Sequence, residues 1–402
     1  MSKFQINRTN LHDLLQAKVV EVINEPAYNW NSPFKSFMTD AEGQLVIRVG
    51  IINFDLDTDI WAGLRSPALV GMHPVTPADI WRHYACLTSK SVRPDGSPNP
   101  LAMPEPFIDA KSRFRRGVII CGMLAVNPEI YQLYGEKIEQ GEEAPFDNYQ
   151  RATDDVSMII NNAIGKTGLA LINPDRAVIP MTDRNTEMVI NRTKSEYFSD
   201  RYHGPCNNHW PNNSLAIMTG LLRFGINRIA FRDEVMANGK QQRLFGRYRS
   251  IVIFDQEPLV TDNVGGVTLL DPNRLKELKR VNDYTNVSDE AISQRYCTYN
   301  LINANGETVC GKCLTACPSG ALLNSSPNPA GIYNDSVTDQ EHRFWEGTLD
   351  FDYANCTNDR LQKAQLYEGY VCARCEVVCA NNGVRKSATK LTQINHKTQV
   401  PE

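Results

Sequence analysis

The sequence has no long hydrophobic run. No stretch approaches the roughly 20 consecutive apolar residues of a membrane-spanning helix. The opening MSKFQINRTNLHDLLQAK contains neither the apolar core of a secretory signal nor a twin-arginine pair. These absences predict a soluble protein of the cytoplasm that has no membrane partner.

The sequence also has no excess of positive charge. Its 42 lysines and arginines stand against 46 aspartates and glutamates, which gives a net charge of -4. A chain with this balance presents no broad basic field to a polyanion, so nucleic acid is disfavoured as the main partner. The 402 residues, 42% of them hydrophobic, suffice for one large domain or two to three ordinary ones.

A disulfide framework is missing as well, because the cysteines are clustered. Of the 11 cysteines, all but three lie between Cys297 and Cys379, and the three isolated ones are Cys86, Cys121 and Cys206. In a reducing compartment, clustering of this kind indicates metal binding rather than disulfides.

The chain divides into three segments, at 1–110, 111–285 and 286–402. The first mixes short apolar runs, such as LVIRVGIINF at 45–54, with proline-rich connections; the runs predict strands joined by long loops, and the fold of the segment is unclear. The last holds the clustered cysteines.

The middle segment alternates between strand and helix patterns. Its predicted elements are the strand FRRGVIICGMLAV at 114–126, a helix at 151–168, the short strand LALINP, a helical SLAIMTGLLRFG, a strand at 247–260 and a linking helix at 271–284. Strands that alternate with helices predict a layered α/β domain. The fold class is therefore predicted to be α+β, with this α/β domain followed by the cysteine-rich module.

The cysteine-rich module repeats one spacing, in CGKCLTAC from Cys310 and in CARCEVVC from Cys372. A C-x2-C pair suits zinc as well as an iron–sulfur cluster, so paired structural zinc sites are the alternative. The further cysteine, Cys317, is followed by Pro318, as at the end of the bacterial ferredoxin run, where the last cysteine ligates the other cluster. The spacing therefore predicts a ferredoxin-like module with two 4Fe–4S clusters, which would serve electron transfer.

Eight cysteines are enough for two such clusters. Glu307 stands where the usual run has its first cysteine, and Cys297 is the nearest replacement, with Glu307 itself as a second possibility. Ala380 replaces the proline that normally follows the second motif. The first cluster is predicted to be bound by Cys297, Cys310, Cys313 and Cys379, and the second by Cys317, Cys356, Cys372 and Cys375.

The order of these features resembles that of epoxyqueuosine reductases and cobalamin-dependent reductive dehalogenases. In that family an α/β domain precedes the two motifs, and a lone cysteine lies between them, as Cys356 does here. Upstream, AIMTGLLRFGINRIAF is similar to the family's A-G-L-G-x-x-G stretch, with Gly220, Leu221 and Gly225 in register. GRYRSIVIFDQEPLVTD is similar to a strand that ends in T-D-x-P-L, with Asp255 matching. The likeness covers roughly residues 110–385.

The resemblance implies a nitroreductase-like α/β domain that holds base-off cobalamin beside one cluster. It implies that the cofactor-binding residues include Gly220, Leu221, Gly225 and Asp255. The resemblance implies that the protein is an oxidoreductase that cleaves a small-molecule substrate reductively, as a dehalogenase does. The electrons would come from an external ferredoxin, flavodoxin or reductase.

Reductive cleavage leaves a carbanion or an alkoxide, which must be protonated. The aspartate that serves the epoxyqueuosine reductases is replaced here by Asn207, in HGPCNNHWPNN. The candidate proton donors are therefore His209 and Tyr202. The candidate substrate contacts are His203, Asn207, Arg223 and Arg228.

Two other functions fit the same residues. One is an epoxyqueuosine-type enzyme that acts on tRNA, which the acidic net charge, the missing aspartate and the short segment after Cys379 disfavour. The other is a non-catalytic electron carrier that reduces a partner or a corrinoid protein, which the length of the α/β domain disfavours. The sequence favours the small-molecule reductase.

Overall fold

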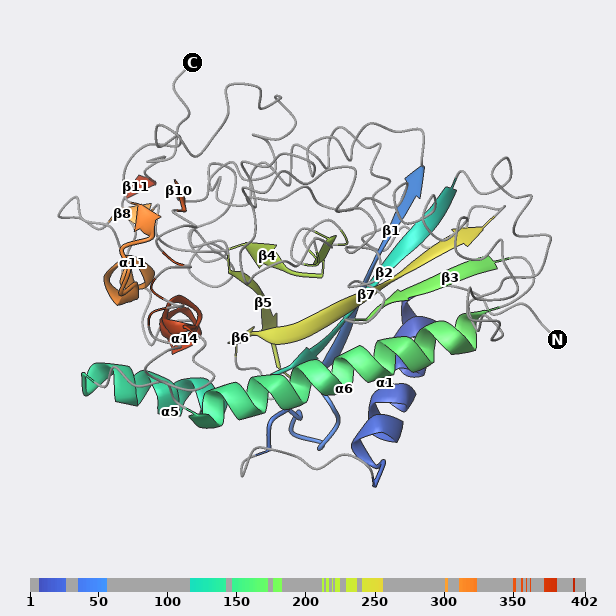
Figure 1. Cartoon of the computed structure of the whole chain (residues 1–402), viewed down its shortest axis with the longest axis horizontal. Coiled ribbons are helices and arrows are strands. Elements are labelled where there is room, and N and C mark those ends of the chain that lie inside the picture. The colour runs from blue at the N-terminus through green and yellow to red at the C-terminus, as the bar shows by residue number, and fades with distance from the viewer. Residues whose placement is uncertain are drawn as a thin grey trace, which may run out of the picture.

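An antiparallel sheet of four strands lies at the centre of the computed structural model (Figure 1). The strand order is β1-β2-β7-β3, and the bounds are Ile47–Asp55 for β1, Arg116–Ala125 for β2, Gly246–Asp255 for β7 and Arg176–Met181 for β3. Strand β2 pairs along its whole length with both neighbours. Strand β3 pairs with Ser250–Asp255 alone, so the first residues of β7 run past the end of β3.

The structure describes about two fifths of the chain. The described residues are 7–26, 35–55, 116–141, 147–172, 176–182, 212, 215–216, 219, 221–224, 229–236, 241–255, 301–302, 311–323, 350–351, 356, 359, 362, 372–381 and 393–394.

Two helices cover one face of the sheet. Helix α1 (Arg8–Ile23) begins after Asn7, whose side chain accepts a hydrogen bond from the Asn10 amide at 2.8 Å and so caps the helix. Helix α6 (Asp147–Leu171) packs along α1 and over β7 (Figure 1). The buried residues of α1 follow helical spacing and face this core; they are Leu11, Leu15, Val19 and Val22.

Thr219 and Leu221 lie against the opposite face of the sheet, at β1. Gly50 of β1 makes this contact possible, because a Cβ atom there would lie 2.6 Å from Thr219 Oγ1 and 2.9 Å from Leu221 Cβ. Leu221 and Leu222 are buried. The sheet is therefore apolar on both faces, which explains the nearly continuous hydrophobic run of β2.

Helix α5 (Pro128–Glu139) follows β2 and joins the sheet to the cysteine motifs. Helix α14 (Arg374–Asn381) packs against α5, and the short α11 (Lys312–Ala316) packs against α14 (Figure 1). A smaller sheet lies beside them, with the order β4-β5-β6. Its strands are Arg223–Phe224, Ala230–Val235 and Gln241–Leu244. Two short pairs complete the described elements: β8 (Leu301–Ile302) with β11 (Gln393–Ile394), and β9 (Leu322–Leu323) with β10 (Asp350–Phe351).

Most of the predicted elements of the sheet are confirmed, and two predictions are wrong. Strands lie at 47–55, 116–125 and 246–255, as the apolar runs indicated. The predicted strand LALINP is wrong, because its first residues form the last turn of α6, with Leu171 buried, and the strand begins only at Arg176. A run this short does not distinguish a strand from a helix end.

The predicted helix SLAIMTGLLRFG is also wrong in its second half. Leu215 and Ala216 are helical, but Arg223 and Phe224 form β4. Helix α1 was not predicted at all. The predicted linking helix at 271–284 lies outside the described residues. Among the helices that the structure describes, none is both long enough and apolar enough to cross a membrane.

Candidate functional site

Thiols from both cysteine motifs come together where α11 packs against α14. Cys313 and Leu322 form a small buried cluster, against which Cys317, Cys375, Leu314 and Val378 pack. The pKa of the Cys375 thiol is raised by burial, and then by the charges of Cys372, Glu376, Cys313 and Cys317. Four thiols of the two motifs therefore share one electrostatic environment: Cys313, Cys317, Cys372 and Cys375.

The Cys317 sulfur lies in a cradle of hydrogen-bond donors. Burial disfavours its thiolate, but hydrogen bonds from the Ser319 hydroxyl and from the amides of Leu322, Ala321 and Ser319 outweigh burial and lower its pKa. Gly320, with φ of 64°, turns the chain so that these amides point inward. Because the thiolate is the form that binds metal, the CPSGAL turn is suited to hold a metal or cluster.

These features fit an iron–sulfur ligand set. Thiols of the two motifs that lie near one another can, once deprotonated, bind a metal or cluster, whose positive charge would offset the repulsion between the thiolates. Among the described residues, no group of three or more His, Cys, Asp or Glu side chains is arranged so that it could hold a metal ion. Cys297 and Cys310 lie outside the described residues, and Cys356 is half-buried at a helical position.

Cys379 lies on a different side of α14. It packs against the main core rather than against the Cys313 cluster. Arg243 of β6 donates a hydrogen bond from Nη1 to the Cys379 sulfur at 3.5 Å. The second motif therefore contacts both the first motif and the body of the protein.

A network of buried polar groups anchors α14 to the central sheet. Glu376 accepts a hydrogen bond from the Tyr131 hydroxyl at 2.7 Å and forms an ion pair with Arg247 of β7 at 3.2 Å. Arg247 also donates to the Tyr149 hydroxyl of α6 at 3.3 Å. The side chain of Glu376 is 14% exposed and that of Arg247 is 24% exposed, so each charge needs the other. Residue Cys375, next to Glu376, is thereby fixed relative to β7.

A pocket of about 240 Å³ adjoins this network, at the place where β7 runs past the end of β3. Its lining residues come from β7, β5, α14 and residue 212; those that carry polar side chains are Asn212, Arg247, Tyr248, Arg249 and Glu376. The Ser250 hydroxyl donates to Asn212 Oδ1 at 3.4 Å and so ties residue 212 to the sheet. The pocket therefore combines two arginines, a phenol and a carboxylate one residue away from a cysteine of the second motif.

Tyr248 is the group in this pocket that can hold a proton at neutral pH and still give it up to a strong base. Burial raises the pKa of its phenol, and the charge of Arg247 lowers that pKa by a smaller amount. A buried phenol of this kind stays protonated until a carbanion or alkoxide forms beside it.

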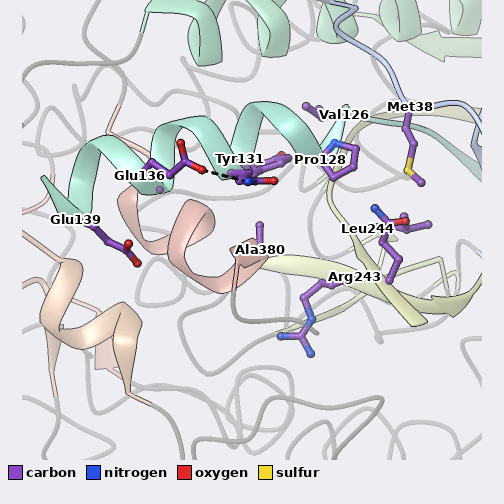
Figure 2. A pocket seen from close by; sticks show the side chains of 12 residues that line it. Met38, Val126, Pro128, Tyr131, Glu136, Glu139, Arg243, Leu244 and Ala380 are labelled. Carbon is purple, nitrogen blue, oxygen red and sulfur yellow. Dashed lines mark hydrogen bonds between the residues drawn. The ribbon is translucent and has the colours of Figure 1, made fainter. Parts of the chain in front are cut away.

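A second pocket, of about 370 Å³, lies between α5, β6 and the end of α14 (Figure 2). Glu136 and Glu139 of α5 line one side, and Arg243 and Leu244 of β6 line another. Ala380, which follows Cys379, closes the pocket on the side of α14.

No protein-family model matches this chain, and no similar curated protein or similar solved structure is found.

The structure places few of the predicted catalytic and cofactor residues. Leu221 is buried against the sheet. The backbone of Arg223 lies in β4. Asp255 ends β7, six residues beyond Arg249 of the pocket and so about 20 Å farther along that strand. The predicted residues outside the described part of the chain are Tyr202, His203, Asn207, His209, Gly220, Gly225 and Arg228.

Sequence reasoning missed Tyr248, Arg247 and Glu376. A signal was present in RYRSIVIF, where charged and aromatic residues open a strand that is otherwise apolar. Charged side chains in an interior strand need polar partners, so the arginines of this run indicate a polar site. Glu376 carried no such signal, since its partners come from β7 and α5.

Proposed function

We propose that this chain is an iron–sulfur reductase that holds two 4Fe–4S clusters and acts on a small molecule bound at the start of β7. The observation that supports this proposal best is the convergence of thiols from both motifs beside a pocket that shares Glu376 with the second motif. Such clusters, when bound, supply single electrons.

The residues of the chain have separate tasks in this proposal. The eight cysteines named from the sequence hold the clusters, and the cradle around Cys317 favours its thiolate. The ion pair between Glu376 and Arg247 keeps the second motif at a fixed place beside the pocket. Arg249 supplies positive charge to an electron-accepting substrate, and Tyr248 supplies the proton that reductive cleavage needs.

Cobalamin is a further part of the proposal that rests on the family resemblance alone. The two pockets, of about 370 and 240 Å³, are of the size that holds drug-sized ligands or smaller ones, and a corrinoid exceeds both. Neither of these two pockets would hold a corrinoid. Of the residues that the resemblance assigns to it, Gly220 and Gly225 lie outside the described part of the chain, and we assign no step to it.

The proposal is tested with anaerobically purified protein whose clusters have been reduced with dithionite and freed of excess reductant. Candidate substrates, including organohalides and epoxides, are then added, and reoxidation of the clusters is followed by visible absorption. We expect substrate-dependent reoxidation, slowed at least tenfold in Y248F, with an unchanged cluster spectrum. Reoxidation by electron-carrier proteins and by no small molecule would instead indicate the electron carrier.

A further inference from the structure

Cys379 differs from the other described motif cysteines in its surroundings. Cys313, Cys317 and Cys375 pack among residues of the two motifs, whereas Cys379 packs against the main core of the protein. Its sulfur therefore meets side chains that the cysteine-rich module does not supply. Arg243 of β6 donates a hydrogen bond to it at 3.5 Å.

Arg243 is held in place from two directions. Its guanidinium carbon lies 4.0 Å from the centre of the Phe231 ring, within the range of a cation–π interaction. Phe231 is 1% exposed and packs against Phe245, with the ring centres 6.1 Å apart. The guanidinium thus rests on a fixed aromatic surface while it donates to the sulfur. Figure 2 shows Arg243 and Ala380 on neighbouring elements, β6 and α14.

A donor at this sulfur has a defined electrostatic effect. Arginine stays protonated at every pH of interest, and it brings both a hydrogen bond and a full positive charge. Reduction of a cluster adds a negative charge, which is shared with the cysteine sulfurs. Hydrogen bonds and positive charge at a sulfur therefore stabilise the reduced form and raise the reduction potential.

We propose that Arg243 is a positioning residue that orients the Cys379 thiolate and raises the reduction potential of the cluster that Cys379 ligates. This inference rests on the proposed iron–sulfur function. On this inference, β6, which lies outside the cysteine-rich module, helps to set which of the two clusters is reduced first.

The test is a redox titration of the anaerobic full-length protein, followed by EPR spectroscopy. The variants are R243Q, which removes the charge, and R243K, which keeps the charge without the planar fork. K137Q, which removes one positive charge from α5, is the matched control. In R243Q we expect the reduction potential of one of the two clusters to fall by about 59 mV. At a fixed applied potential, this fall lowers the reduced-to-oxidised ratio of that cluster about tenfold.

R243K should give a smaller fall in the same potential, and K137Q should leave both potentials unchanged. Equal potentials in wild type, R243Q and R243K would overturn the role of Arg243 while the iron–sulfur proposal stands. Absence of clusters from the wild-type protein would overturn the iron–sulfur proposal itself, which is a separate result. If R243Q loses its clusters on purification, the R243K potential decides.

Discussion

At the scale of single residues, the cysteines of this chain fall into two chemical classes. Cys121 lies in β2 with 1% exposure, and burial raises the pKa of its thiol to about 12, although a hydrogen bond with Thr219 opposes the shift. Cys317 has donors around its sulfur, and its pKa is lowered. Complete burial with a single opposing hydrogen bond keeps a thiol neutral, whereas several donors around a less buried sulfur favour the thiolate that binds metal.

This contrast predicts a difference in alkylation. After the clusters are removed with a chelator and an oxidant, iodoacetamide at pH 8 should modify Cys317 and leave Cys121 unmodified, because the Cys121 thiolate is hardly populated. Peptide mass spectrometry measures both sites, and labelling in denaturant, where both should react, is the control. Equal rates at the two cysteines in the folded protein would contradict the assignment.

Glu376 is predicted to matter more for stability than its exposed neighbours do. E376Q keeps the shape of the side chain but leaves Arg247 with no carboxylate in a partly buried site, so we expect a loss of about 2 kcal/mol in the free energy of unfolding. E136Q, on the exposed face of α5, should change stability by less than about 0.5 kcal/mol. Denaturant unfolding of the anaerobic protein measures both, and indistinguishable midpoints would refute the anchoring role.

At the scale of elements, close packing on both faces of the sheet is the main constraint. Gly50 lets Thr219 and Leu221 lie against β1, while Gly165 of α6 has more room, since the nearest atom to a Cβ there is Thr182 Cγ2 at 3.5 Å. Close packing therefore requires glycine at position 50 and does not require it at position 165. Gly50 allows two segments to approach, and Gly165 weakens a helix.

Substitution by alanine should consequently have opposite effects at these positions. G50A forces the Thr219 segment away from the sheet and should lower the free energy of unfolding by about 1–3 kcal/mol. G165A should raise it by about 0.5–1 kcal/mol, because alanine loses less entropy in a helix. Thermal unfolding of both variants measures the signs. A stabilised G50A protein would mean that Thr219 and Leu221 do not lie on β1.

Helices α1 and α6 are joined by surface ion pairs that titrate. Lys166 Nζ lies 2.7 Å from Glu21 and 2.5 Å from Glu25, and Lys18 lies 2.7 Å from Glu21. The hydrogen bond from Lys166, and then that from Lys18, lowers the pKa of Glu21 from 4.5 to about 2. A depressed carboxyl pKa stabilises the fold above the unfolded value, and this stabilisation is lost as pH falls toward 2.

We therefore expect the wild type to lose more stability than E21Q between about pH 5 and pH 2. The effect should be small, since exposed ion pairs contribute little and are screened by salt. E42Q, whose carboxylate lies in an exposed turn, serves as the control. Unfolding midpoints measured across this range test the prediction, and parallel curves for the wild type and E21Q would count against the ion pairs.

At the scale of the whole molecule, local patterns could be predicted and long-range partners could not. The apolar runs predict β1, β2 and β7, because strands buried on both faces need apolar residues throughout. Helix α1 could have been predicted from the spacing of Leu11, Leu15 and Val19. The cysteine spacing predicts the ligand chemistry. The antiparallel strand order, the anchoring of α14 by Glu376 and the pocket at Tyr248 depend on residues far apart in the sequence, and no local pattern encodes them.

The central claim is that the two motifs bind 4Fe–4S clusters. The measurement that tests it most directly is the content of iron, acid-labile sulfide, zinc and cobalt in anaerobically purified protein. We predict about eight irons and about eight sulfides per chain, since two such clusters contain that number. About two zinc ions per chain with no sulfide would contradict the claim, and would assign the motifs to structural zinc sites.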